Sequence, residues 1–385
     1  MGVIMNDILD GNLKSAVSDA LAKVDYMMET LGNKFAASAS VNNVYEAVDN
    51  ITYTDWNQGF WSGILWLAWE LSGDSKYKEL ALSHLSSFRQ RIEGRYGVNH
   101  HDMGFLYTPS CVAAYKLTGN KEAREIALLA AENLLSRYHE KGRFIQAWGE
   151  LGTRENYRLI VDCLLNIPLL YWAFETTGNK KYWNAAYAHF RTTVENAIRA
   201  NGTSFHTFFF DPDTGAPLHG ATHQGASDDS CWARGQAWVI YGLMMTRAYI
   251  DDPNAVPLCK KAVNIFLNRL PKDWIPFYDL CFTDGSYEPR DSSAAAIAAC
   301  GILELLKYLP DNDESRQAYK NAVGYIMDSL YENYSTKDIP ESNGLLLHAT
   351  YAKPQGIGID ECNIWGDYFY MEALVRLCKD WNMYW

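Results

Sequence analysis

Two kinds of helical segment alternate along the sequence. Segments of the first kind place apolar residues three and four positions apart with polar residues between them, a pattern typical of half-exposed helices. They cover residues 13–31, 73–92, 118–138, 177–198, 252–270 and 313–334. Segments of the second kind are apolar nearly all round, which indicates buried helices. They cover residues 58–71, 104–117, 158–174, 234–249, 291–309 and 366–381.

This alternation predicts an all-α fold, an (α/α)6 barrel in which the buried helices form the inner ring and the half-exposed helices the outer ring. An open α-solenoid is the alternative architecture, but its inner helices would need a solvated concave face, and these segments have none. No Pro-, Gly- or Ser-rich linker divides the chain, so we expect a single catalytic domain over residues 1–385.

The segments that connect the helices differ in length and composition. Short glycine turns such as LSGD (71–74) follow the buried helices, whereas long loops rich in aromatic and polar residues precede them. In a closed barrel the long loops all emerge at one end. We therefore expect the binding pocket at that end.

The composition narrows the choice of partner. A formal net charge of -12 argues against a broad nucleic-acid or membrane surface but leaves room for a local basic pocket. The eight cysteines lie far apart without a C-x-x-C pair, which favours reduced thiols. No basic segment followed by an apolar run opens the chain, and no stretch is long enough to cross a bilayer. We expect a cytoplasmic monomer or weak homo-oligomer that binds neither nucleic acid nor membranes.

Asp162 stands among apolar neighbours in RLIVDCLLNIPLLYWAF (158–174). On helical spacing it shares one stripe with Arg158 and Asn166, which should face the barrel axis. An ion pair with Arg158 would explain the carboxylate as a structural feature. We favour a functional interpretation, because a partly desolvated aspartate near the pocket can keep its proton at neutral pH and act as a general acid.

Asp102 in NHHDMGF (99–105) precedes a predicted buried helix and could be its N-cap. It could equally supply the second carboxylate that glycosidic chemistry uses. A metal site built from His100, His101 and Asp102 is disfavoured, because there is no HExxH motif and three adjacent loop residues should not converge on one ion. We predict no metal, and also no nucleotide cofactor, since no Walker loop or complete dinucleotide fingerprint is present.

Aromatic residues and hydrogen-bond donors gather in or beside the long loops. The tryptophans are Trp56, Trp61, Trp148, Trp232, Trp238 and Trp365. Tryptophan usually packs in cores, but flat apolar rings next to polar donors also hold sugar rings. His206, Gln224 and Arg234 supply donors. Arg234 could pair bidentately with a substrate carboxylate, or structurally with Asp228 or Asp229.

Seven stretches, in order, closely resemble the unsaturated glucuronyl hydrolases, family 88 of the glycoside hydrolases, over essentially the whole chain. They are WNQGFWSGILWLAWE, HHDMGFLYTPS, GRFIQAWGELG, YRLIVDCLLN, SDDSCWARGQAWVIYG, FTDGSYEPRDSSA and NIWGDYFYMEAL. The resemblance implies an (α/α)6 barrel that needs no metal. It also implies removal of a 4,5-unsaturated uronic acid from the non-reducing end of oligosaccharides left by polysaccharide lyases.

The resemblance also implies roles for individual residues. Asp162 matches the general acid and base, which protonates C4 of the double bond while water adds at C5. Asp102 matches the second essential aspartate, which orients the substrate and tunes its partner. The positions that match sugar-binding residues of the family are Trp56, Trp148, His206, Gln224, Arg234, Trp238 and Tyr351.

One departure from the family concerns sulfate. Members that favour sulfated fragments carry two serines and a lysine in the loop before the last inner helix, where this chain has Ala352, Gln355 and Ile357. Lys353 lies nearby at a different offset. We therefore expect a preference for unsulfated substrates. Two alternatives stay open, an unsaturated rhamnogalacturonyl hydrolase acting on pectin fragments and a non-catalytic carbohydrate-binding protein of helical repeats.

Overall fold

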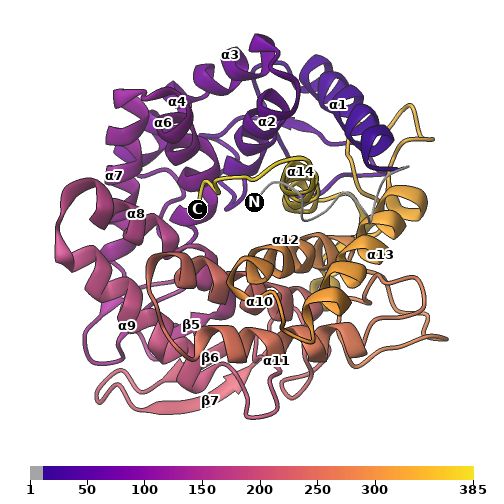
Figure 1. Cartoon of the computed structure of the whole chain (residues 1–385). Coiled ribbons are helices and arrows are strands. Elements are labelled where there is room, and N and C mark those ends of the chain that lie inside the picture. The colour runs from indigo at the N-terminus through magenta and orange to yellow at the C-terminus, as the bar shows by residue number, and fades with distance from the viewer. Residues whose placement is uncertain (1–11) are drawn as a thin grey trace.

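The computed structural model describes residues 12–385, and its helices form a closed double ring (Figure 1). The outer ring contains α1 (Asn12–Leu31), α3 (Ser75–Ser83) with α4 (Leu85–Glu93), α7 (Lys121–Leu135), α9 (Lys180–Asn196), α11 (Ala255–Asn268) and α13 (Arg316–Tyr334). The inner ring contains α2 (Gly59–Ser72), α5 (Met103–Tyr107) with α6 (Ala113–Thr118), α8 (Pro168–Thr177), α10 (Ala233–Tyr249), α12 (Ser292–Tyr308) and α14 (Ile364–Cys378). The predicted (α/α)6 barrel is confirmed. Residues 1–11 of the expected domain lie outside the described residues.

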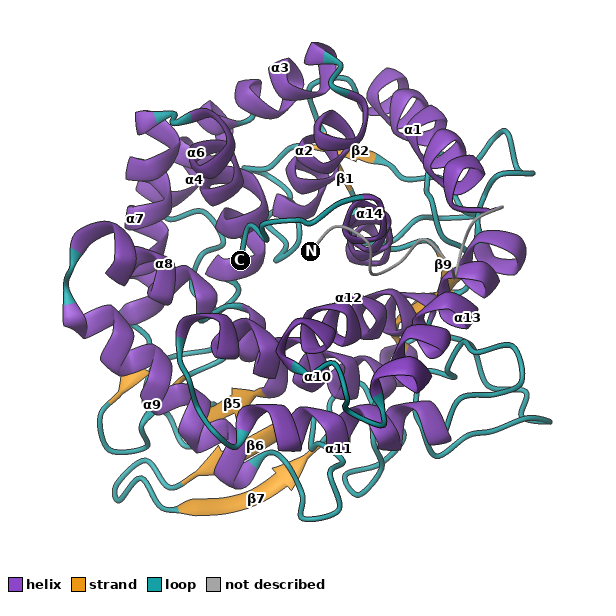
Figure 2. Cartoon of the chain, viewed as in Figure 1, coloured by secondary structure: helices purple, strands orange, loops and turns teal. Residues whose placement is uncertain are grey.

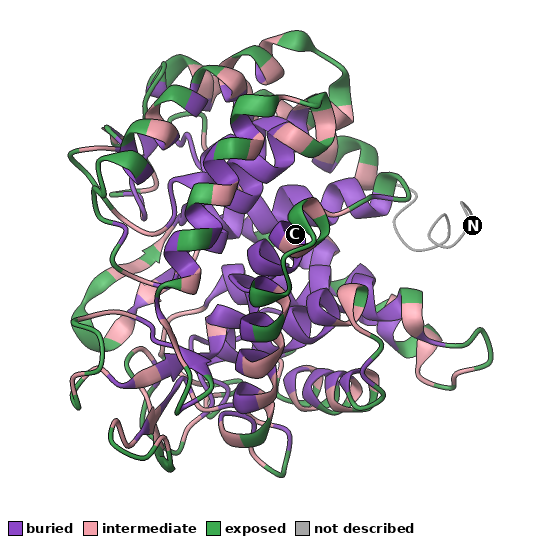
Figure 3. Cartoon of the chain, turned by 90° about the vertical axis from the view of Figure 1, so that its left-hand side faces the viewer, coloured by how far each residue is buried: buried purple, intermediate pink, exposed green. Residues whose placement is uncertain are grey.

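The burial of each helix follows its sequence pattern. The inner helices are buried along nearly their whole length, whereas the outer helices alternate between buried and exposed residues (Figure 3). Helix α7, for example, buries Ala123, Ile126 and Ala130 on one face and leaves its charged residues in solvent.

The short glycine turns connect inner to outer helices by a repeated device. Gly73, Gly119 and Gly178 each follow an inner helix with a φ between 71° and 74°, a left-handed conformation that glycine adopts at little cost. The next residue is then the N-cap of the outer helix, and its side chain accepts a hydrogen bond from that helix. These caps are Asp74, Asn120 and Asn179.

Two predicted helix boundaries are wrong. The segment 158–174 begins as strand β5 (Arg158–Ile160) and a 3-10 turn, η2 (Val161–Leu165), and only at Pro168 does α8 start. Proline suits a first helical turn because its missing N–H would have no partner there. Arg158 and Asp162 therefore do not share a helical stripe. The last inner helix ends at Cys378, short of the predicted 381.

The loops that precede the inner helices contain short antiparallel strands (Figure 2). The pairs are β1 (Phe35–Ala36) with β2 (Ala47–Val48), β3 (Tyr138–His139) with β4 (Phe144–Ile145), and β8 (Ala349–Ala352) with β9 (Ile357–Glu361). A three-stranded sheet joins β5, β6 (Thr207–Phe210) and β7 (Pro217–Ala221), with Arg158 opposite Phe209. These strands give the long loops a fixed shape.

The chain after α14 packs against the inner helices. The ring of Trp385 stacks on Phe369 at 6.0 Å, and its Nε1 donates to Glu372 at 2.9 Å. Glu372 and Glu304 both pair with Arg376, at 3.0 and 2.7 Å, so the charges inside the barrel compensate one another. Among the described helices, none is both long and apolar enough to cross a membrane.

Candidate active site

The long loops enclose a cavity of about 250 Å³. Its lining contains Trp56, His101, Asp102, Trp148, Ile160, Asp162, His206, His223, Gln224, Trp232, Arg234, Trp238 and Tyr351. All nine residues predicted for the site lie in this lining. Two other tryptophans of the predicted aromatic cluster do not, because Trp61 and Trp365 are fully buried in the core.

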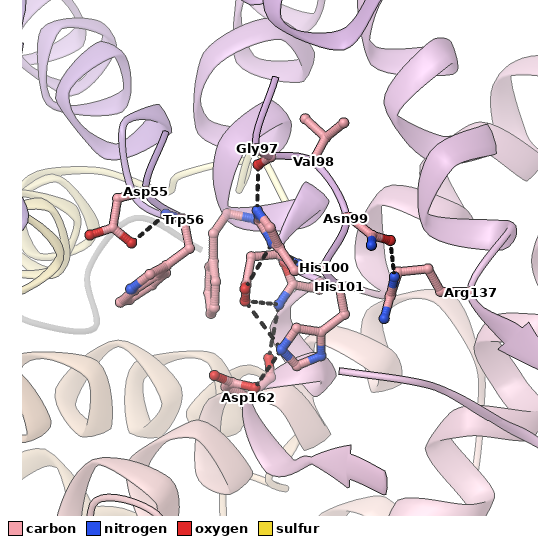
Figure 4. Close-up of polar contacts among 12 residues, drawn as sticks. Asp55, Trp56, Gly97, Val98, Asn99, His100, His101, Arg137 and Asp162 are labelled. Atoms are coloured by element: carbon pink, nitrogen blue, oxygen red, sulfur yellow. Dashed lines mark hydrogen bonds and ion pairs between the residues drawn. The ribbon is translucent and has the colours of Figure 1, made fainter. Parts of the chain in front are cut away.

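Buried arginines hold the loops around the cavity. Arg91, on α4, donates from Nη1 to Asn50 and Gln58, both at 2.8 Å, and from Nη2 to the backbone oxygen of Asp55 at 2.6 Å. Arg137 follows α7 and donates in the same way to Asn99 and to the backbone oxygens of Gln146 and Gly149 (Figure 4). Each guanidinium thus satisfies several loop acceptors at once, which fixes loops that lack regular structure.

The carboxylates of both candidate catalytic residues approach His101, which lies beside Asp162 in Figure 4. Its Nε2 lies 3.3 Å from Oδ1 of Asp102 and 3.4 Å from Oδ1 of Asp162, slightly long for hydrogen bonds. Its backbone N–H donates to Ala147 at 2.8 Å, which ties this loop to the one that carries Trp148. Burial lowers the pKa of His101 to about 4, so the ring is neutral at pH 7. We place its proton on Nε2, between the carboxylates.

Asp102 precedes α5 but does not cap it with its side chain. The carboxylate turns instead toward His100, whose Nδ1 lies 3.0 Å from Oδ2, and toward Asn166, whose Nδ2 donates to Oδ1 at 3.4 Å. Asn166 also accepts from the N–H of Phe105 at 2.9 Å. Its close approach to α5 requires Gly104, since a Cβ there would lie 2.3 Å from the Cα of Asn166. The side chain of Asp102 therefore serves the cavity and not the helix.

The environment shifts the pKa values of the two carboxyl groups in opposite directions. Burial raises the pKa of Asp162 well above its ordinary value, and the nearby charge of Asp102 raises it further. Burial also acts on Asp102, but His101, His100 and the Asn166 amide outweigh it and lower the pKa of Asp102. The pair thus combines a carboxyl group that holds its proton more strongly with one that releases it more readily.

The same residues form the set of side chains best placed to hold a metal ion among residues 12–385. Ligand atoms of His101, Asp102 and Asp162 lie within 4.8 Å of one another. Spacing along the sequence suggested only the adjacent His100, His101 and Asp102, because the third residue of this set, Asp162, comes from a distant segment. Their contacts are also accounted for without an ion, by an Nε2–H between two carboxylates. The absence of a metal requirement stays a prediction.

His206 and Gln224 present donors to the cavity. The Nδ1 of His206 accepts hydrogen bonds from the backbone N–H groups of His223 and Gln224, at 2.9 and 3.1 Å. Nδ1 therefore carries no proton, which leaves Nε2 as a donor. The side-chain oxygen of Gln224 accepts from Arg234 at 3.1 Å, so its amide NH₂ is the end left for a ligand.

Arg234 is engaged more fully than the sequence suggested. Its Nη1 donates to Asp291 at 2.7 Å and to the backbone oxygen of Thr350 at 2.6 Å, and its Nη2 donates to Gln224 and to the backbone oxygen of Tyr351. The expected structural partners, Asp228 and Asp229, are not used. With both Nη atoms occupied and the charge paired with Asp291, Arg234 has its Nε–H left for a substrate carboxylate.

The aromatic residues form two groups around the cavity. The Nε1 of Trp56 donates to the hydroxyl of Tyr351 at 2.8 Å, which fixes both rings on one side. Trp148 lies elsewhere in the lining, 5.6 Å from the ring of His223. Trp238 is almost fully buried and packs on Phe105 at 5.3 Å. Flat faces on several sides of a small polar cavity suit a sugar ring.

Several residues of the site had no catalytic or sugar-binding role in the sequence prediction. They are His101, Ile160, Asn166, His223 and Trp232, of which Trp232 was named only within the aromatic cluster and Asn166 only beside Asp162. His101 and His223 are direct neighbours of the predicted Asp102 and Gln224, and that adjacency was the available signal. Ile160 carried no signal, because an apolar residue in an apolar segment looks like core.

Comparison with known proteins agrees with this geometry. A family model described as Glycosyl Hydrolase Family 88 matches residues 27–270. The chain is 49% identical over 370 residues to the unsaturated chondroitin disaccharide hydrolase of Streptococcus pneumoniae, covering 96% of this chain and 93% of the relative. It is 40% identical over 373 residues to the unsaturated glucuronyl hydrolase of a Bacillus species, covering 97% and 98%.

Comparison with solved structures indicates the same family. The crystal structure of unsaturated glucuronyl hydrolase from Streptococcus agalactiae matches with a TM-score of 0.95 and 47% identity, covering 99% of this chain and 96% of that chain. Its similarity extends over the barrel and the loops that enclose the cavity. The chain therefore belongs to glycoside hydrolase family 88 and is an enzyme of the unsaturated glucuronyl hydrolase class.

Proposed function

We propose that this enzyme removes 4,5-unsaturated glucuronic acid from the non-reducing end of glycosaminoglycan disaccharides and related oligosaccharides left by lyases. The observation that carries this is the pair of Asp102 and Asp162, which line one aromatic-rich cavity and whose pKa values are shifted in opposite directions. Relatives at 49% identity are named unsaturated chondroitin disaccharide hydrolases, which supports the substrate class.

Asp162 is the proton donor in this scheme. Its proton goes to C4 of the double bond, and the positive charge left at C5 is shared with the ring oxygen. Water then adds at C5 and returns a proton to the Asp162 carboxylate. The resulting hemiketal opens to a ketone, which turns C1 into a hemiacetal that expels the next sugar. Proton transfer to carbon requires a neutral acid, which is why the raised pKa of Asp162 suits this reaction.

Asp102 has a supporting role. Its negative charge keeps the proton on Asp162, and its ionised oxygens accept hydrogen bonds from a substrate hydroxyl. His101 holds the two groups in register, since its Nε2 lies within 3.4 Å of an oxygen of each. The Nε–H of Arg234 and the His206 and Gln224 donors are placed to receive the carboxylate and hydroxyls of the unsaturated ring.

The reaction can be tested by ultraviolet absorbance, since hydration destroys the conjugated double bond. We expect the absorbance of an unsulfated unsaturated chondroitin disaccharide to fall when the enzyme is added. Persistence of that signal together with loss of the signal of an unsaturated galacturonyl-rhamnose disaccharide would indicate the rhamnogalacturonyl alternative. Persistence of both would contradict hydrolysis and favour a carbohydrate-binding protein.

We also infer that the enzyme prefers unsulfated substrates to 6-sulfated ones. The three positions that differ from sulfate-binding family members are not replaced by other cations. Gln355 donates to the backbone oxygen of His223 at 2.6 Å, Ala352 is buried, and Ile357 is half exposed. Lys353 pairs with Glu288 at 3.0 Å, so its charge is already compensated. A structure of the Streptococcus agalactiae enzyme is a complex with dGlcA-GalNAc6S, which makes that relative a suitable reference.

The sulfate preference gives a prediction about Ile357. We expect the wild type to hydrolyse unsulfated chondroitin disaccharide faster than its 6-sulfated form, and Ile357→Lys to raise kcat/KM for the 6-sulfated form about tenfold by restoring a cation. Leu129→Lys, which adds the same charge to an exposed position on the outer helix α7, should change neither rate. A wild type that strongly favours the 6-sulfated disaccharide would show the inference to be wrong.

Other expectations stay predictions, with some support. A buried apolar core runs from Ala16 to Trp385, which supports one catalytic domain over the expected residues 1–385. All eight cysteines are unpaired thiols, which supports a reducing, cytoplasmic location. The expected monomer or weak homo-oligomer, and the absence of nucleic-acid and membrane partners, rest on composition.

A further inference from the structure

Arg158 lies beside the candidate active site with its charge uncompensated. Its Nε is buried and has no hydrogen-bond partner among the described residues. Burial lowers the pKa of Arg158, and no carboxylate offsets that effect. Taking a guanidinium partly out of water without a partner costs free energy. An anionic group of a ligand would offset that cost by pairing with the guanidinium.

Nearby acidic side chains are already occupied. Arg154, four residues earlier, pairs with Asp211 at 2.9 Å and with Asp213 at 2.7 Å. In a chain whose formal net charge is -12, an arginine without an acidic partner at the edge of a cavity is unexpected. The loop that carries Asp211 and Asp213 therefore supplies no carboxylate to Arg158.

Aromatic packing orients the guanidinium. Its Cζ lies 4.2 Å from the centre of the Trp148 ring and 5.0 Å from that of Phe209. Stacking uses the flat faces of the group and leaves the N–H groups in its plane for bidentate contact with a carboxylate or a sulfate. Trp148 lines the cavity, so an anion held by Arg158 would border the same sugar chain.

Strand geometry places Arg158 one step outside the cavity. Side chains two residues apart on a strand share a face, and Ile160, which lines the cavity, is two residues from Arg158 on β5. The offset is about 6.6 Å along the strand. The charge of Arg158 still reaches inward, since it lowers the pKa values of His223 and His206.

We infer that Arg158 binds an anionic group of the leaving saccharide, the part of the substrate beyond the unsaturated ring. This rests on the proposed function, which puts the unsaturated ring next to Asp162 and the leaving saccharide toward the cavity mouth. The anion is a sulfate ester on the first leaving sugar or the carboxylate of the following uronic acid. Both offer planar or trigonal faces of oxygen atoms that a guanidinium binds through two hydrogen bonds.

Steady-state kinetics on three substrates test this inference. They are the unsulfated chondroitin disaccharide, whose leaving sugar is neutral, its 4-sulfated form, and an unsulfated hyaluronan tetrasaccharide, which adds a uronic acid. We expect Arg158→Gln to raise KM about tenfold on a substrate whose leaving saccharide is acidic, with kcat little changed and the unsulfated disaccharide unaffected. Arg158→Lys should recover part of the loss, because charge remains while the bidentate contact is gone.

Arg154→Gln is the matched control. It removes the same chemical group four residues away, from a guanidinium already paired with half-buried Asp211 and exposed Asp213. We expect it to leave all three KM values unchanged. Added salt should raise KM for the acidic substrate in the wild type and not in Arg158→Gln.

The possible outcomes distinguish a sulfate site from a carboxylate site, and failure of the Arg158 inference from failure of the proposed function. A defect of Arg158→Gln confined to the 4-sulfated disaccharide identifies a sulfate site, and one confined to the tetrasaccharide identifies a carboxylate site. An equal loss on all three substrates would show that Arg158 only positions Trp148, and no loss on any would also overturn the inference. Failure of the wild type to hydrolyse any of them would instead contradict the proposed function.

Discussion

Replacing Asp162 by asparagine is expected to lower kcat about a thousandfold on unsulfated chondroitin disaccharide, with KM little changed. Asparagine has nearly the same shape and can still hydrogen-bond, but it has no proton to give to carbon. The Asp162 side chain is largely buried and faces the cavity. Among the described residues, Asp102 is the acid grouped with it, and no further acid is there to donate the proton instead. The measurement is the rate at which ultraviolet absorbance of the double bond disappears.

A control is needed for the loss of one negative charge in an acidic protein. Asp213→Asn removes a charge from an exposed loop residue that pairs only with Arg154, and should leave kcat unchanged. Circular dichroism of both variants would show that the barrel is intact. If Asp162→Asn kept kcat within tenfold of the wild type, Asp162 could not be the proton donor.

Replacing Asp102 by asparagine is expected to lower kcat about a hundredfold at pH 7 and to change the pH profile. In the wild type the donor must be protonated, so activity is present below the pKa of Asp162 and is lost as pH rises through it. The charge of Asp102 is one of the causes that raise that pKa. Its removal lowers the pKa of Asp162, and the alkaline limb of the kcat profile should move to lower pH.

The acidic limb gives a second readout of the same variant. In the wild type, activity should fall at low pH as Asp102 takes up a proton. This limb should lie below the pH at which an ordinary aspartate titrates, because His101 and His100 outweigh burial and lower the pKa of Asp102. Asp102→Asn should lack that limb. The measurement is kcat across the pH range for wild type, Asp102→Asn and Asp213→Asn. An alkaline limb that stays in place, or moves to higher pH, would contradict the electrostatic role of Asp102.

Local patterns were sufficient for the barrel. Apolar spacing identifies which helices are buried, and the Gly-Asp and Gly-Asn turns at Gly73, Gly119 and Gly178 mark where an inner helix ends and an outer one is capped. These are interactions between residues a few positions apart, so a single sequence contains them. The position of the site could be predicted in the same way, because the long loops that precede the inner helices must all lie at one end of a closed barrel.

Local patterns failed where distant segments decide the structure. The apolar run from residue 158 predicts a helix, yet residues 158–160 form strand β5, which pairs with β6 and places Arg158 opposite Phe209. Arg234 reads as a free donor, yet it is held by Asp291 and by the backbone of Thr350 and Tyr351. Spacing along the chain does not contain these contacts.

The sequence by itself determined the double ring of helices, through local periodicity. It also determined the family and nine of the residues that line the cavity, through residue types and the resemblance of seven stretches to known family members. Only the tertiary structure decided the chemistry of Asp102 and Asp162. Their pKa values depend on burial and on charges brought together from separate loops, with His101 between them. It also decided that Arg158 has no acidic partner among residues 12–385, because the groups around a charge come from segments far apart in the sequence.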